Sequence, residues 1–377
     1  MPWQVRPMSD IRLAFVHHVL TLNQPVARTC RQFGISRKTG YKWLQRYRRD
    51  PGQPLGDHSR RPRRSPQRTT ETVEQRILEV RDRFGWGAPK IHAFLTQQGV
   101  SLPSIRTVNA VLERRGRTRP QQPSEPADQR FERDEPNQLW QIDFKGPTEV
   151  ARQRVTPLTV IDDHSRFLLA LTPCTDCRMN TAWSVLWDLM GDVGMPSAVL
   201  TDNAFSTRFQ NHAGVSWFDA RLIRADIQPL HGRPYHPQTQ GKVERLHGTI
   251  ATEVYPRVRR DTLEHFRQDL DNWRTGVYNT LRPHEALGQL PPITRWRPSR
   301  RIRPETLPPV QYPPDAVLRK VFHPGLIHWR RCRIRVGAGI IGQSVRIEQR
   351  DDLITVFYAW KEIRCLDSRN LQPYRVL

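Results

Sequence analysis

The sequence predicts a multidomain chain with an all-α N-terminal region, a central α/β domain and a small all-β barrel at the C-terminus. Apolar residues recur with helical period through most of the stretch from residue 10 to residue 116. Between residues 136 and 297, short runs rich in aromatic and β-branched residues alternate with helical patterns. Residues 316–377 contain about five short alternating or β-branched runs, separated by the turn signals HPG, GAG and RDD.

Polar, proline-containing segments divide the chain into these regions, because proline and like-charge repulsion keep a segment extended. The predicted order is a helix-turn-helix domain at 1–50, a basic Pro/Arg linker at 51–70, a second helix-turn-helix domain at 71–118, a linker at 119–135, the α/β domain at 136–297, a Pro-rich linker at 298–315 and the barrel at 316–377. At 377 residues the chain is long enough for each domain to bury a core.

The first helical region has the outline of a helix-turn-helix. A tight turn at Gly34 follows a short helix, and Ser36 is placed to cap a basic third helix. Such a helix would lie in the major groove of DNA, and the residues expected to reach the bases are Arg37, Lys38, Thr39 and Lys42. Trp43 and Leu44 are expected to pack inward. A three-helix packing module with a solvated basic face is the alternative.

The linker and the second helical unit extend this prediction. The linker arginines expected to lie along DNA phosphates are Arg60, Arg61, Arg63 and Arg64. The second unit would form helices at about 71–84, 88–98 and 103–115, with Arg106 and Thr107 facing outward on the third. Two units in tandem would read more than one turn of duplex. A structural role remains the alternative, because residues 71–135 carry 11 basic and 10 acidic side chains.

The charge of the chain points to nucleic acid. The formal net charge is +23, and residues 1–70 hold 15 basic but only 3 acidic side chains, while residues 301–377 hold 14 and 7. Most of the excess is arginine, which suits phosphate recognition. A solvated surface would explain scattered charges but not this asymmetry, which predicts nucleic acid as the partner. The helix-turn-helix outlines make that partner double-stranded DNA. A membrane-surface protein is disfavoured, because no basic helix with a continuous apolar face stands out.

Location and cysteine usage give a second set of expectations. The sequence has no signal peptide and no run of about 18 apolar residues. Five cysteines form no disulfide framework, and the lone C-x-x-C at Cys174 and Cys177 lacks the second pair of a zinc site. We therefore expect reduced thiols in a bacterial cytoplasm, close to the nucleoid.

Three carboxylates carry the candidate chemistry. Asp143 and Asp202 each end an apolar run, in QLWQIDF at 138–144 and LTDNA at 200–204, and Glu244 lies on a helix that follows a Pro/Gly-rich loop. Taken separately, each has an ordinary structural role: a turn-forming Asp, or a Glu pairing with Lys242 or Arg245. Together they form the set of oxygen ligands that Mg²⁺ takes in proteins. Asp162 and Asp163, in the hairpin DDHSR, are assigned to turn chemistry.

Two further stretches belong with these motifs: YHPQTQGKVERLHGTI at 235–250 and YNTLRPHEAL at 278–287. Together the four stretches resemble DDE transposases of bacterial insertion sequences, which have an integrase core of the retroviral-integrase-like superfamily. The resemblance covers residues from about 136 to 300. It implies an RNase H-like fold, and it implies that Asp143, Asp202 and Glu244 form a catalytic triad binding two Mg²⁺ ions, with Mn²⁺ as a substitute. The resemblance to integrases also implies a DNA-binding barrel in the tail.

The sequence departs from the family pattern in one spacing and at one expected DNA contact. Asp202 and Glu244 are 42 positions apart, several more than usual, which an insertion around 208–217 would explain. Ala251 stands where relatives place Lys or Arg, so Lys242, Arg245 or His247 is expected to take over that contact. His236 would position DNA or a water, or serve only the structure of its loop. In the tail, the expected phosphate contacts are Arg330, Arg331, Arg333 and Arg335.

The sequence thus predicts a DNA transposase that binds terminal inverted repeats, cleaves the 3′ ends and transfers them to target DNA. A homo-oligomer, dimer or tetramer, is expected because two ends must be joined. One alternative is a sequence-specific DNA-binding regulator or domesticated transposase without catalysis, which Ala251 favours. Another is a stand-alone nuclease, for which two helix-turn-helix units and a barrel would be excessive. The sequence leaves open whether an ATP-dependent accessory protein selects the target.

Overall fold

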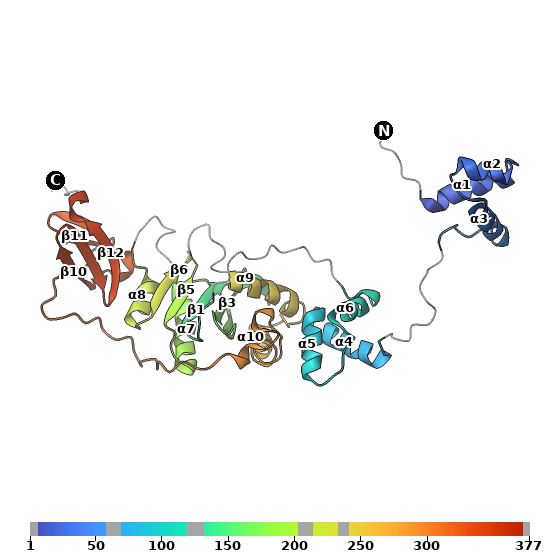
Figure 1. Cartoon of the computed structure of the whole chain (residues 1–377). Helices are drawn as coiled ribbons and strands as arrows, with labels where there is room; N and C mark the ends of the chain where they lie inside the picture. Colours follow the sequence, from blue (N-terminus) through green and yellow to red (C-terminus); the bar gives the residue numbers. More distant parts are fainter. Residues whose placement is uncertain (1–6, 58–68, 119–131, 203–213, 233–240, 372–377) are drawn as a thin grey trace. The chain divides into compact units, whose positions relative to one another are not determined.

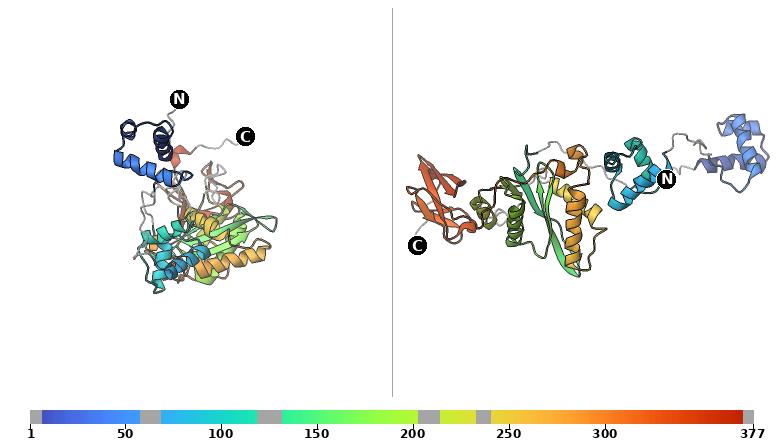
Figure 2. Two further views of the ribbon diagram at one scale, coloured as in Figure 1. Left: turned by 90° about the vertical axis from the view of Figure 1, so that its right-hand side faces the viewer. Right: turned by 90° about the horizontal axis from the view of Figure 1, so that it is seen from below.

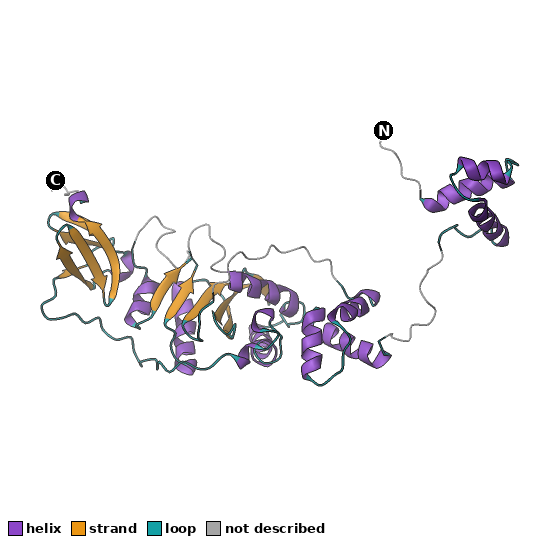
Figure 3. Cartoon of the chain, in the orientation of Figure 1, coloured by secondary structure: helices purple, strands orange, loops and turns teal. Residues whose placement is uncertain are grey.

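The computed structural model describes residues 7–57, 69–118, 132–202, 214–232 and 241–371 (Figure 1). The chain forms two compact units, Met1–Arg68 and Thr69–Leu377. In the described residues, the elements as far as α6 are all helices, strands and helices mix in the central region, and strands dominate the C-terminal region (Figure 3). Within these described residues, no helix has both the length and the apolar character needed to cross a membrane.

The first unit is a three-helix domain whose described part spans residues 7–57. Its helices are α1 (Met8–Leu20), α2 (Val26–Gln32) and α3 (Arg37–Arg49). The side chain of Ser36 accepts the backbone N–H of Thr39 at 3.1 Å, so the predicted N-cap is confirmed. Trp43 and Leu44 are buried with Phe15, as expected.

The close packing of α3 against the other two helices requires a glycine. A Cβ at Gly40 would lie 2.5 Å from Cys30 Sγ and 2.9 Å from the ring of Phe15. One face of α3 is therefore committed to the core, and its opposite face carries the exposed basic residues Arg37, Lys38 and Lys42.

The second unit begins with another three-helix module, residues 69–118. Its helices end within two residues of the predicted bounds and are α4 (Glu71–Phe84), α5 (Ala88–Gln97) and α6 (Ile105–Arg114). The buried carboxylate of Glu74 accepts hydrogen bonds from Arg114 and Arg115. Some charged residues of this module therefore form ion pairs that hold α4 against the end of α6.

The central domain is built on one mixed sheet. Its strands are β1 (Leu139–Phe144), β2 (Thr148–Val150), β3 (Gln153–Asp162), β4 (Leu168–Cys174), β5 (Ala198–Thr201) and β6 (Gln228–His231). β3 is antiparallel to β1, β2 and β4, whereas β5 and β6 run parallel to β1. The first three long strands and their DDHSR hairpin lie where the sequence predicted them.

Helices cover both faces of this sheet (Figures 1 and 2). Trp140 and Ile142 of β1 share one core with α7 (Met179–Val193) and α8 (Trp217–Arg224). On the other face, Ile161 of β3 shares a core with a second set of helices. These are α9 (Gly241–Thr249), the π-helix η4 (Ile250–Val254), α10 (Leu263–Asn272) and the π-helix η5 (Trp273–Tyr278).

The segment predicted as a Pro-rich linker, 298–315, packs on the central domain. The N–H of Met195 donates to the carbonyl of Arg301 at 2.8 Å, and Arg224 donates to the carbonyl of Pro308 at 3.0 Å. Gly194 has φ +79, and a Cβ there would lie 2.5 Å from the carbonyl oxygen of Ser299. The chain therefore reaches its C-terminal region along a defined path.

The C-terminal region contains two sheets. Its strands are β7 (Leu318–Lys320), β8 (Leu326–Trp329), β9 (Cys332–Arg335), β10 (Ser344–Arg350), β11 (Leu353–Tyr358) and β12 (Lys361–Asp367). Four strands pair in the order β12-β11-β10-β7, and β8 pairs with β9. Among the described strands these pairings make two separate sheets, so closure into a barrel stays a prediction.

This β region packs against α8 of the central domain. The N–H of Val215 donates to the carbonyl of Val336 at 2.9 Å, and the indole N–H of Trp360 donates to the carbonyl of Ile223 at 2.8 Å. A Cβ at Gly337 would lie 2.2 Å from the backbone nitrogen of Val215. The glycine in the predicted turn GAG is thus required by backbone-to-backbone contact.

A buried ion pair joins the helical module to the central domain. Glu253 of η4 accepts hydrogen bonds from Nε and Nη2 of Arg282, both at 2.8 Å. It also accepts the indole N–H of Trp86, from the helical module, at 3.2 Å. Three segments that are remote along the chain therefore meet at one carboxylate.

Replacing Glu253 by Ala is expected to lower the free energy of unfolding of this unit by about 3–5 kcal/mol, because a buried guanidinium would lose its partner. Glu264→Ala, which breaks the exposed pair with Arg267, should change it by less than about 1 kcal/mol. Denaturant-induced unfolding of both variants measures the difference. Equal effects of the two substitutions would contradict the role given to Glu253.

Candidate active site

Two of the three candidate carboxylates follow adjacent parallel strands. Asp143 lies near the carboxyl end of β1, and Asp202 comes directly after β5. The strand register pairs Ile142 with Thr201, so the next residue on each strand is one of these two aspartates. Neighbouring strands are about 4.8 Å apart, which brings the two side chains together at one edge of the sheet.

The third carboxylate comes from α9, which packs over the same face of the sheet. Along β1, Trp140 and Ile142 point into the core beneath α7, so Asp143 points toward the side of α9. Glu244 is exposed in the first turn of α9. Two strands and a helix therefore place the three carboxylates in one region of the domain, where the charges of Asp202 and Glu244 both act on Asp143.

The electrostatics of Asp143 reflect this convergence. Burial is the main cause that raises the pKa of Asp143 from 3.8 to about 7, and the negative charge of Asp202 is the second. Glu244 adds a smaller contribution in the same direction, and a hydrogen bond from the backbone of Phe144 opposes them. At neutral pH Asp143 is thus partly protonated, because burial and the neighbouring carboxylates disfavour its charged form.

The donor set fits a divalent cation. Within the parts of the chain that the structure describes, no three His, Cys, Asp or Glu side chains converge closely enough to hold a metal ion as they stand. Asp202 and α9 adjoin the segments 203–213 and 233–240, which lie outside the described residues. A divalent cation would relieve the repulsion that raises the pKa of Asp143, and carboxylate oxygens are ligands that Mg²⁺ and Mn²⁺ accept.

His247, on the same face of α9 as Glu244, is a neutral neighbour of Asp143. Burial first, and the charge of Lys145 second, lower the pKa of His247 to about 4. Its Nδ1 lies 3.9 Å from Asp143 Oδ2, so at neutral pH this contact is not an ion pair. His247 therefore supplies no positive charge in place of the basic residue that Ala251 lacks.

The tautomer of His247 follows from its second contact. Thr159 donates its hydroxyl proton to the carbonyl of Asp143 at 3.0 Å. The same hydroxyl oxygen lies 3.0 Å from His247 Nε2, and it has no second proton to give. Nε2 therefore carries the proton, and the unprotonated Nδ1 is on the side of Asp143.

Lys242 does not lie free for DNA, contrary to the prediction. Its ammonium group donates to the carboxylate of Asp163 and, at 3.2 Å, to the carbonyl of Asp163. Asp163 is fully buried and also accepts the side-chain amide of Gln141 at 2.7 Å. Burial lowers the pKa of Lys242, and the charge of Arg166 lowers it further. This lysine of the first turn of α9 is thus used internally.

Asp163 has a larger role than the turn chemistry assigned to it. Asp162 does form the turn, accepting the N–H of Ser165 at 2.8 Å. Asp163 instead connects β1 to α9, through Gln141, two residues before Asp143, and Lys242, two residues before Glu244. No local pattern in DDHSR distinguishes the two aspartates, so the sequence contained no signal for this connection.

The predicted DNA contacts fall into three groups. Thr39 and Thr107 are partly buried, whereas the side chains exposed on α3, α6 and α9 are Arg37, Lys38, Lys42, Arg106 and Arg245. His236 and the linker residues Arg60, Arg61, Arg63 and Arg64 lie outside the described residues. Arg330 and Arg331 form the turn between β8 and β9 with φ of 43° and 62°, and Arg333 and Arg335 share one face of β9. All of these contacts stay predictions.

Comparison with protein families agrees with this architecture. An integrase core domain matches residues 133–237 and again 225–292. A helix-turn-helix domain matches residues 11–63, and a homeodomain-like domain matches residues 39–112. The chain contains an integrase core preceded by helix-turn-helix domains.

Individual relatives come from insertion elements and retroviruses. The chain is 25% identical over 236 residues to the uncharacterized 39.2 kDa protein of insertion element IS476 from Xanthomonas euvesicatoria, covering 60% of this chain and 65% of that protein. It is 27% identical over 235 residues to the uncharacterized 31.7 kDa protein of insertion element IS407 from Burkholderia multivorans, covering 60% of this chain and 81% of that protein. It is 34% identical over 115 residues to the Gag-Pro-Pol polyprotein of squirrel monkey retrovirus, covering 30% of this chain but 6% of the polyprotein.

A solved structure of the HTLV-2 integrase catalytic core in complex with magnesium matches 43% of this chain and 97% of that one, with 17% identity and a TM-score of 0.32. The integrase core of this chain thus has both bacterial insertion-element homologues and viral relatives.

The raised pKa of Asp143 predicts a specific pH dependence. Because this carboxyl holds its proton more tightly in the folded chain than in the unfolded chain, its ionisation lowers stability as pH rises from about 4 to about 7. Without divalent metal, Asp143→Asn is therefore expected to increase stability by about 1–4 kcal/mol near pH 8 and by less than about 1 kcal/mol near pH 4, where the unfolded carboxyl is itself partly protonated. Thermal unfolding in a chelator measures this, and an equal effect at both pH values would contradict it.

The contact between Lys242 and Asp163 predicts a second effect. Lys242→Met leaves the buried carboxylate of Asp163 without its cation, and we expect a loss of about 3–5 kcal/mol in stability. Arg245→Met, on the exposed side of α9, is the matched control and should change stability by less than about 0.5 kcal/mol. Chemical denaturation of both variants measures the free energy of unfolding. Similar losses of stability in the two variants would argue against a role for Asp163 in holding α9 to β1.

Proposed function

We propose that this chain is a DNA transposase whose integrase core has an RNase H-like fold. It would cleave the 3′ ends of its element and transfer them to target DNA. The observation that carries this proposal is the parallel pairing of β1 with β5, which puts Asp143 and Asp202 at adjacent positions. Burial, then the charge of Asp202 and more weakly that of Glu244, raise the pKa of Asp143 to about 7. Carboxylates from two strand ends and a helix suit divalent metal ions and the phosphate chemistry that they support.

In this proposal Asp143, Asp202 and Glu244 hold two Mg²⁺ ions, with Mn²⁺ as a substitute. When bound, such ions lower the pKa of the attacking oxygen and offset charge on the scissile phosphate. The carboxylates act as ligands and not as nucleophiles. Asp163 keeps Glu244 in reach of Asp143 by holding the start of α9 to β1. His247, neutral at physiological pH, adds no charge that would compete with the metal ions.

DNA would be bound by the regions that precede and follow the core in the sequence. The exposed basic residues of α3 suit the major groove of the terminal inverted repeats, and Arg106 of α6 suits the adjoining duplex. The C-terminal β region, proposed to be a small barrel, would hold phosphates through the turn at Arg330 and Arg331 and the row on β9. Joining two ends requires at least two protomers, assembled on DNA at the bacterial nucleoid.

The ends of the element are first identified as inverted repeats by sequencing the genomic flanks. The test is then whether the protein joins labelled end DNA to target DNA in a metal-dependent reaction. Glu244→Gln is expected to reduce strand transfer by more than about 100-fold, since even residues that only orient a metal ligand contribute 10–100-fold. Affinity for end DNA should not change, because the substitution leaves the helix-turn-helix domains intact. Glu264→Gln, exposed on α10, is the control.

Two results would refute this proposal. Undiminished strand transfer by Glu244→Gln would exclude Glu244 from the triad. Specific binding of end DNA, with no joining in either Mg²⁺ or Mn²⁺, would favour the alternative of a DNA-binding regulator or domesticated transposase, to which Ala251 gives some weight.

A further inference from the structure

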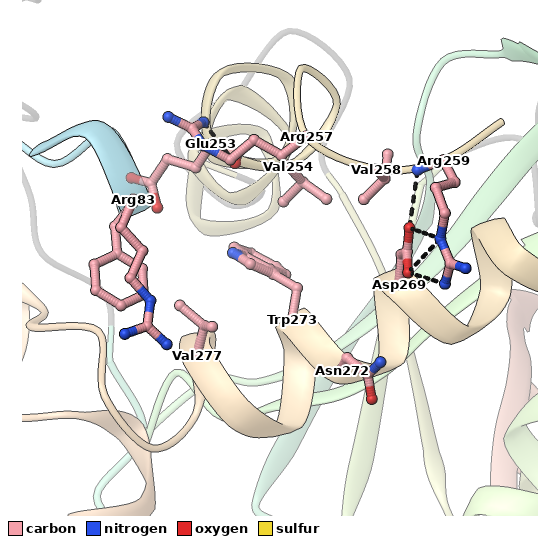
Figure 4. Close-up of a pocket in the computed structure, with 11 residues that line it drawn as sticks. Arg83, Glu253, Val254, Arg257, Val258, Arg259, Asp269, Asn272, Trp273 and Val277 are labelled. Atoms are coloured by element: carbon pink, nitrogen blue, oxygen red, sulfur yellow. Dashed lines mark hydrogen bonds and ion pairs between the residues drawn. The ribbon is translucent and has the colours of Figure 1, made fainter. Parts of the chain in front are cut away.

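A cavity of about 500 Å³ lies between the helical module and the central domain, away from the three carboxylates (Figure 4). Its walls are the end of α4, the π-helix η4 with residues 257–259, and the α10–η5 helix. Glu244 and Glu253 lie nine positions apart on the continuous α9–η4 helix, which corresponds to about 13 Å along its axis. The cavity is therefore close to the candidate active site but separate from it.

The interior of the cavity offers an aromatic surface. Trp273, at the start of η5, directs its indole ring into the cavity, with Val254 and Val258 on the opposite wall (Figure 4). Phe84 and Val277 complete the apolar lining. Trp273 is partly buried, so part of its ring remains accessible from the cavity. A flat, apolar slot of this kind suits a planar ring system.

The charged groups of the cavity leave two cations uncompensated. Its lining includes three arginines and two acidic residues. Asp269 is bound by Arg259, with Nη2 and Oδ1 2.6 Å apart, and Glu253 is neutralised by Arg282 from outside the lining. Among the ion pairs of the described residues, neither Arg83 nor Arg257 has a carboxylate partner; Arg257 donates only to the backbone carbonyl of Glu253, at 3.0 Å.

These two arginines come from different walls of the cavity, Arg83 from the end of α4 and Arg257 from the segment after η4 (Figure 4). Gly85, two residues after Arg83, ends α4 with φ +76. A Cβ at Gly85 would lie 3.0 Å from Nη2 of Arg257, so the guanidinium of Arg257 packs directly against this turn. A guanidinium group on each of two walls, with an aromatic side chain in the lining, is a combination that binds the phosphates and the ring of a nucleotide.

We propose that this cavity binds one unpaired nucleotide of a DNA strand, with its base against Trp273 and its two flanking phosphates at Arg83 and Arg257. The proposal rests on the proposed function only in taking DNA as the substrate. A base within a duplex is stacked on both faces and cannot enter a cavity, so the nucleotide must be unpaired. The site would thus recognise a strand extension or a melted position beside the reacting end.

Photocrosslinking of the full-length chain tests this. The probe is a short duplex with a single-stranded 5′ extension that carries 5-iododeoxyuridine, compared with the same base placed inside a blunt duplex. We expect a crosslink to Trp273 or Phe84 with the extended duplex alone, located by mass spectrometry. Crosslinks that map only to other residues, or equally with the blunt duplex, would overturn the proposal.

A charge reversal at the rim provides a test that does not depend on the core. Arg83→Glu should weaken binding of the extended duplex by about 5- to 100-fold more than binding of the blunt duplex, the range that loss of one held base produces. Arg76→Glu, exposed on the same helix, is the matched control and should weaken both duplexes equally. Equal effects of Arg83→Glu on the two duplexes would overturn the proposal.

Competition with a free deoxynucleoside monophosphate distinguishes a DNA strand from a free nucleotide as the ligand. If the monophosphate abolishes the crosslink while the extended duplex gains no affinity over the blunt one, the ligand is a free nucleotide and the proposal for a strand is overturned. The binding and crosslinking measurements need no divalent metal. They therefore report on the cavity even if strand transfer is absent, so failure of this proposal and failure of the proposed function are distinguishable.

Discussion

The parallel pairing of β1 with β5 is the constraint on which the candidate site depends. It places Asp143 and Asp202 at adjacent positions on one edge of the sheet, where burial and mutual repulsion raise the pKa of Asp143. Two ionised carboxylates at this spacing destabilise the fold, and the surrounding core must compensate. The apolar residues on both faces of the sheet do so, because they are buried almost completely.

The α9–η4 helix connects the candidate site to the helical module of the same unit. Asp163, through Lys242, holds its first turn to the sheet beside Glu244. At its other end, Glu253 binds Arg282 and Trp86 of the helical module. A displacement of the helical module along α9 would therefore act on the helix that positions Glu244. In the proposed function, DNA bound by that module and metal ions held by the three carboxylates would both act on this continuous helix.

Much of the domain order was predictable from local patterns. Helical period, the cap at Ser36 and the apolar runs before Asp143 and Asp202 each depend on a few neighbouring residues, so they are legible in the sequence. The packing of the segment 298–315 was not predictable in this way. Its prolines correctly indicated an extended chain, but its contacts with Met195 and Arg224 depend on partners about 100 residues away. The closed barrel also stays undecided, since alternation predicts strands and not their pairing.

The sequence by itself determined which residues could bind a cation or a phosphate, because charge and local conformation belong to each residue and its neighbours. Only the tertiary structure decided which of these groups are available. Lys242 is occupied by Asp163, Glu74 by two arginines, and Arg83 and Arg257 are left at the rim of a cavity. The physical reason is that a charge entering the interior must find a partner, and that partner is chosen by packing between segments far apart in the chain.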